Sequence, residues 1–118
     1  MSLAQLTLNL VEGSVAFSFT PQSARELQNA IAGLMESLKA AAVKPSGSPG
    51  KKAAPQKSME YRHTGDIFLE IFCNPNIWPS PFAAKVLITL RDDRIRITTE
   101  AELTRLVEDV NQYLEQMG

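Results

Sequence analysis

Cysteine and histidine are almost absent from this chain of 118 residues, which has only Cys73 and His63 of these two types. One cysteine cannot form a disulfide within the chain or a multi-cysteine metal site, and one histidine cannot supply a two-histidine metal site. No apolar run reaches the roughly 18–20 residues that a membrane helix needs, and no secretion signal is recognisable. The sequence therefore predicts a cytoplasmic protein with no cofactor and no membrane partner.

The net charge is only −1, but it is unevenly distributed along the chain. Residues 41–63 hold five basic and one acidic side chain, about +4, which leaves −5 for the rest. Within this part, residues 43–59 are rich in proline, glycine and small polar residues, a composition that buries too little apolar surface to offset the entropy of ordering. We predict one domain, residues 1–118, with sub-lobes at 1–42 and 60–118 joined by a flexible basic linker at 43–59.

The first sub-lobe begins with alternating apolar and polar residues on both sides of Gly13. This period-two pattern around a glycine-containing turn predicts a β-hairpin. Its apolar residues are Leu6, Leu8, Leu10, Val15, Phe17 and Phe19. Thr20 is typical of a helix N-cap and Pro21 of the first helical position. We therefore expect an amphipathic helix at about 21–40, with the apolar stripe Leu27, Ile31, Leu34 and Leu38.

The second sub-lobe predicts three strands and a helix. Residues 67–72 are apolar on both faces except at Glu70, residues 86–90 alternate, and a turn at 91–93 leads to Ile95 and Ile97. Thr99 and Glu102 have the spacing of a capping box, which predicts a helix at about 100–116. Its apolar stripe is Leu103, Val107, Val110 and Leu114. Glu108 and Asp109 then lie opposite this stripe, and Glu100 and Glu102 in the first turn, so these acidic residues need no metal.

The two helix stripes match at a constant offset of 76 residues, and each follows a predicted hairpin. This indicates a pseudo-repeat of β-β-α units in the order β-β-α-linker-β-β-β-α. Because neither hairpin nor helix is stable alone, we predict an α+β fold with one antiparallel sheet of five strands and both helices on one face. The expected core includes Leu27, Ile31, Leu34, Leu103, Val107 and Val110.

The other face of this sheet carries aromatic residues between polar ones. If Leu69 and Ile71 face the helices, Phe68 and Phe72 face away. An apolar patch with a polar rim is typical of a partner surface, although the linker or the loop at 74–82 could instead cover it. Trp78, in that proline-rich loop, is either an interface anchor or a cap on the core.

We therefore expect a non-enzymatic protein-interaction, assembly or adaptor protein that acts through this surface as a homodimer. The expected partner-binding residues are Phe68, Phe72, Trp78, Arg94 and Arg96. Unpaired strand edges of an open sheet are a second place for self-association across a two-fold axis.

Two other functions stay open at this point. Lysines of the linker could contact nucleic-acid phosphates weakly and without sequence preference; they are Lys44, Lys51, Lys52 and Lys57. A small-ligand or enzyme site near Cys73 and His63 would require a base or a helix N-terminus to activate the thiol.

From Asp66 onward the chain loosely resembles a COMM domain. Most of the likeness lies in VLITLRDDRIRITTEAELTRLVEDVNQYLEQM, residues 86–117, and it covers less than half of the chain. The resemblance implies a dimerising scaffold module.

Overall fold

The computed structural model describes residues 5–42 and 55–117. Their elements, in chain order, are β1 (Gln5–Asn9), β2 (Ser14–Ser18), α1 (Pro21–Ala42), β3 (Met59–Thr64), β4 (Phe68–Cys73), the 3-10 turn η1 (Pro75–Ile77), β5 (Lys85–Arg91), β6 (Arg96–Glu102) and α2 (Leu103–Met117). The fold class is α+β, as the sequence predicts. Most of the predicted linker lies outside the described residues, and its last residue, Met59, begins β3.

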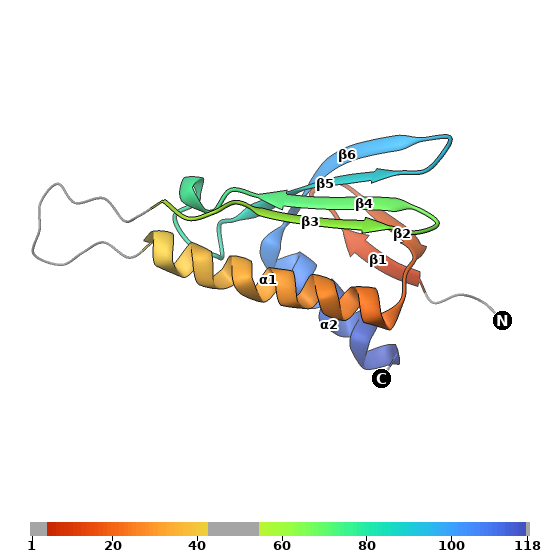
Figure 1. Ribbon diagram of the computed structural model, residues 1–118, viewed down its shortest axis with the longest axis horizontal. Helices are drawn as coiled ribbons and strands as arrows, with labels where there is room; N and C mark the ends of the chain where they lie inside the picture. Colours follow the sequence, from red (N-terminus) through yellow and green to blue (C-terminus); the bar gives the residue numbers. More distant parts are fainter. Residues whose placement is uncertain (1–4, 43–54, 118) are drawn as a thin grey trace, which may run out of the picture.

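The strands form two antiparallel sheets rather than the single five-stranded sheet predicted from the sequence. One sheet is the β1–β2 hairpin, and the other has the order β3-β4-β5-β6. Both helices and the hairpin lie on one side of the four-stranded sheet (Figure 1). The prediction missed β3 because only Tyr61 of this strand is a buried apolar residue and its neighbours Glu60 and Arg62 are exposed. The predicted pseudo-repeat is not confirmed.

The first hairpin and its helix form where the sequence places them. The turn is closed by the Leu10 amide, which donates to the Gly13 carbonyl at 2.9 Å, and Gly13 has the positive φ of 92° that favours glycine. After this hairpin, the Thr20 hydroxyl oxygen accepts from the Ser23 amide at 3.1 Å and caps α1. The predicted stripe of α1 is buried at all four positions, Leu27, Ile31, Leu34 and Leu38.

The start of α2 differs from the prediction. Thr99–Glu102 is the end of β6, not a capping box, because these residues pair with β5 in the register Ile88↔Thr99 to Lys85↔Glu102. The helix begins directly at Leu103. Glu100 and Glu102 are therefore exposed strand residues and do not lie in a first helical turn.

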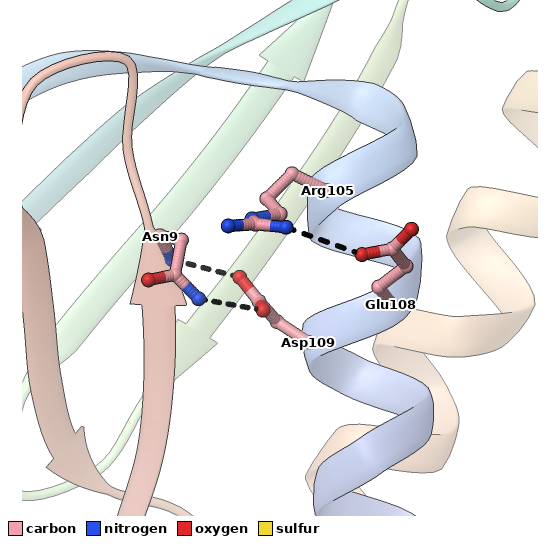
Figure 2. Close-up of polar contacts among 4 residues, drawn as sticks. All are labelled: Asn9, Arg105, Glu108 and Asp109. Carbon is pink, nitrogen blue, oxygen red and sulfur yellow. Dashed lines mark hydrogen bonds and ion pairs between the residues drawn. The ribbon is translucent and has the colours of Figure 1, made fainter.

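The buried face of α2 is also rotated relative to the predicted stripe. Its buried residues are Leu103, Leu106, Asp109, Val110 and Tyr113. Val107 and Leu114, which were expected in the core, are only partly buried. The prediction that Asp109 lies opposite the apolar stripe is wrong, because its side chain points toward β1 (Figure 2) and is only 7% exposed.

Asp109 joins the last helix to the first strand. Its carboxylate accepts from the Asn9 backbone amide at 2.7 Å and from the Asn9 side-chain amide at 2.9 Å, across 100 residues of sequence (Figure 2). One turn later, the Tyr113 hydroxyl donates to the Phe19 carbonyl at 2.6 Å. These bonds fix the hairpin to α2 at Asn9, beside its turn, and at Phe19, after β2. A two-stranded hairpin is only marginally stable by itself, so we expect these bonds to stabilise it.

We predict that Asp109→Asn lowers the free energy of unfolding by about 2–3 kcal/mol, because two hydrogen bonds to a buried carboxylate are weakened. Chemical denaturation would measure the change. Glu108→Gln is the matched control: Glu108 is exposed and pairs with Arg105 at 3.4 Å (Figure 2), an ion pair that contributes less than about 1 kcal/mol. Equal stabilities of the two variants would contradict the role given to Asp109.

The two tyrosines predict a loss of stability at alkaline pH. Burial, together with the charge of Glu26, raises the pKa of Tyr61 to about 12, and burial raises the pKa of Tyr113. An unfolded tyrosine has a pKa of about 10. As the pH rises, the unfolded chain therefore loses these protons first, and stability that is complete below pH ~10 falls as the pH approaches 12. Phenolate absorbance at increasing pH tests this, and titration of both groups near pH 10 in the folded protein would contradict it.

Candidate protein-interaction surface

One face of the four-stranded sheet is turned away from both helices and the hairpin (Figure 1). We call it the outer face. Strand pairing arranges its side chains in three rows across the strands β3, β4, β5 and β6. The rows are Glu60, Phe72, Leu87 and Glu100; Arg62, Glu70, Thr89 and Thr98; and Thr64, Phe68, Arg91 and Arg96.

The outer face carries opposite charges at its two ends. The first row, here the acidic row, has Glu60 and Glu100 on either side of Phe72 and Leu87. The last row, here the basic row, has Arg91 and Arg96. The apolar side chains belong to these two rows, and the row between them is polar. The opposite charges at its ends give the face a direction along its strands, and a partner with the reverse order of charges would complement it.

Contacts within the outer face hold several of these side chains in place. The Arg62 guanidinium donates to Glu70 across the β3–β4 pair at 2.6 Å. The Arg91 guanidinium lies 4.4 Å from the centre of the Phe68 ring, a cation–π contact. Thr89, in the middle of the face, is buried, while Leu87 remains 42% exposed. The most accessible apolar side chain of the face is therefore Leu87, which the sequence-based list of site residues does not contain.

The structure brings three of the five predicted site residues together. Phe68, Phe72 and Arg96 lie on the outer face, and Arg94 is exposed in the neighbouring β5–β6 turn. Trp78 lies elsewhere: it packs against the core and its side chain hydrogen-bonds to Cys73, whose side chain is buried. The contact with the core corresponds to the second of the two roles considered for Trp78, a cap.

The loop after β4 does not cover the outer face. Its turn η1 packs against α1, and Asn76 fixes it to the chain before β3, accepting from the Gln56 amide at 2.7 Å and donating to the Gln56 carbonyl at 2.8 Å. Two apolar side chains of this loop, Ile77 and Phe82, are exposed. The linker, the other possible cover, lies outside the described residues except at its end.

A second uncovered apolar region lies beside β6. Ile95 is 59% exposed and Ile97 is 37% exposed. They line a groove of about 150 Å³ together with Val15, Ile67 and Leu90. The groove forms because β2 and β6 belong to different sheets; the described backbone bond between the hairpin and β6 runs from the Val11 amide, in the β1–β2 turn, to the Glu100 carbonyl at 3.1 Å. The alternation of apolar and polar residues places Ile95 and Ile97 on the same face of their strand. It does not show whether another element packs against that face.

Cys73 and His63 do not form a catalytic pair. In the β3–β4 register, Cys73 lies opposite Met59 and His63 opposite Leu69, so the two are four residues apart along the strands, or ~13 Å. The His63 ring packs against Phe19 with 4.9 Å between ring centres. Burial raises the pKa of the Cys73 thiol, and the hydrogen bond from Trp78 lowers it by less. This arrangement disfavours the thiolate that a nucleophile needs.

We predict that Cys73 reacts slowly with a thiol reagent at neutral pH in the folded protein and rapidly after denaturation, since it is buried and its pKa is raised. A spectroscopic thiol assay with and without denaturant measures both rates. Trp78→Phe removes the hydrogen bond and retains an aromatic ring, so it should not increase thiolate formation. Rapid modification of the native wild-type thiol would instead support a site at Cys73.

Within residues 5–42 and 55–117, no group of three or more histidine, cysteine, aspartate or glutamate side chains is placed to hold a metal ion. In the same ranges, neither helix has the length and apolar character required to cross a membrane. Comparison of the chain with protein-family models, curated proteins and solved structures found no match. The likeness to a COMM domain therefore stays a prediction, and the functional argument rests on the surfaces described above.

Proposed function

We propose that this protein is a non-enzymatic interaction module that works as a homodimer and binds a protein partner through its outer face. The observation that supports this best is the uncovered face itself, in which Phe72 and Leu87 lie in the acidic row and Phe68 lies in the basic row. No described helix or loop lies over it (Figure 1). Aromatic and arginine side chains together are the usual main contributors to protein binding.

The contacts of the face agree with a preformed binding surface. Arg91 is held over Phe68, and Arg62 is paired with Glu70, so these long side chains lose less conformational entropy on binding than free ones would. The expected partner surface has apolar groups opposite Phe72 and Leu87, acidic groups opposite Arg91 and Arg96, and basic groups opposite Glu60 and Glu100. Predicted site residues Arg94 and Arg96 belong to the rim of this contact.

The raised pKa and burial of Cys73 argue against the enzyme alternative. For the nucleic-acid alternative, Lys57 is exposed, whereas Lys44, Lys51 and Lys52 lie outside the described residues. The basic row has two arginines, but the outer face also carries three glutamates, Glu60, Glu70 and Glu100, which would repel phosphates. A protein partner is therefore the function that the geometry supports best.

Leu87→Lys tests the outer face. The protein would be used as bait in cell extract, and each retained protein would then be purified and titrated calorimetrically against wild type and variant. A lysine beside Phe72 should weaken binding at least tenfold, about 1.4 kcal/mol, while circular dichroism and solution mass stay unchanged.

Phe82→Lys is the matched control, because it places the same charge on an apolar residue that is 85% exposed but lies outside the outer face. Its affinity for the purified partner should equal that of wild type. A partner that binds Leu87→Lys as tightly as wild type, or that loses affinity only for Phe82→Lys, would contradict the proposal.

A further inference from the structure

The free edge of β6 offers unpaired backbone groups in a defined order. The Asp92 amide donates to the Ile95 carbonyl at 3.0 Å, so Ile95 directs its backbone groups toward β5. Because this direction alternates along an antiparallel strand, Ile97 and Thr99 also bond to β5, whereas Arg96, Thr98 and Glu100 direct theirs to the free edge. The bond from Val11 to the Glu100 carbonyl confirms that direction.

The bond from Val11 to Glu100 limits the length over which another strand can pair with β6. Because Val11 already binds the Glu100 carbonyl, an added strand finds both the amide and the carbonyl free at Arg96 and at Thr98. The remaining edge contains no further described backbone partner. A two-residue ladder of this kind has one arrangement with two-fold symmetry, in which Arg96 of each strand lies opposite Thr98 of the other and Ile97 lies on the axis.

We propose that two copies of this chain pair through β6 in this antiparallel register, centred on Ile97. Arg96 and Thr98 of both copies would form four backbone hydrogen bonds, the number that the free groups allow. Self-pairing is favoured over pairing with an unrelated strand by charge, since Glu100 of one copy lies opposite Arg94 of the other, in its β5–β6 turn. Opposite charges across antiparallel strands stabilise their pairing.

The side chains on the inner side of β6 support the same register. Ile97 would meet Ile97 of the second copy at a non-hydrogen-bonded position, where side chains approach closely. Ile95 would lie opposite Thr99, and both isoleucines would be covered beside the groove formed with Val15 and Leu90. The contact thus covers exposed β-branched residues on an edge strand, which would otherwise be open to unspecific pairing.

The pairing would join two four-stranded sheets into one of eight strands, with both outer faces on the same side. This inference rests on the homodimer of the proposed function and specifies its contact. It leaves Leu87, Phe72 and Phe68 free for a partner. Arg94, Arg96 and Glu100 belong to both contacts, but the two proposals are tested at different residues and can fail separately.

Cysteine cross-linking tests the register. Ile97→Cys places two thiols at Cα positions about 4.5 Å apart, within the range of a disulfide, and should give a covalent dimer on mild oxidation. Thr99→Cys is the matched control, because its two copies would lie ~13 Å apart and should stay uncross-linked. Wild type controls for Cys73, which is buried. Cross-linking of Thr99→Cys in preference to Ile97→Cys would overturn the register.

Light scattering supplies the second measurement. Wild type should approach twice the chain mass of 13.0 kDa with increasing concentration, and Thr98→Pro should weaken association at least tenfold. Proline at this position removes an edge donor and no bond to β5. If wild type is a dimer and Thr98→Pro leaves that dimer intact, the β6 contact is overturned but the homodimer is not. If wild type is a monomer at every concentration, both are overturned, and the titration of the outer face remains the test of partner binding.

Discussion

The buried carboxylate of Asp109 holds the first element of the chain against the last. The β1–β2 hairpin belongs to neither edge of the four-stranded sheet and has one backbone bond to it, from Val11 to Glu100. The two bonds from Asn9 to Asp109 and the bond from Tyr113 to Phe19 therefore decide where the hairpin lies. With the hairpin in place, Leu6, Leu8 and Phe17 complete a core that the two helices alone would leave open.

This arrangement covers only one face of the sheet. Helices and hairpin share the inner face (Figure 1), so the outer face, with an aromatic residue in its acidic row and another in its basic row, meets solvent. β2 and β6 belong to different sheets, and Ile95 and Ile97 are exposed beside the groove between them. Both proposed contacts, the outer face and the β6 edge, thus follow from how the hairpin is attached, and Arg96 belongs to both.

Local patterns predicted the elements whose signals lie within a few residues. The Gly13 turn, the Thr20 cap and the α1 stripe are confirmed, because each depends on neighbouring side chains and backbone. Thr99 and Glu102 show where this reasoning fails: a capping-box spacing occurs inside a strand whose pairing with β5 outweighs the local preference. Similarly, β3 has little apolar alternation of its own and forms because β4 offers it a partner along its whole length.

Sequence alone therefore determined the α+β class, the alternation that turns Phe68 and Phe72 away from the helices, and most of the core, since these depend on local periodicity and on burial of apolar side chains. Tertiary structure decided the division into two sheets, the burial of Asp109, the separation of Trp78 from the outer face and the exposure of Ile97. The two sheets, the burial of Asp109 and the exposure of Ile97 depend on which segments far apart in the chain come into contact. No local pattern encodes such a contact, because the partner that outweighs a local preference appears only when the chain is folded.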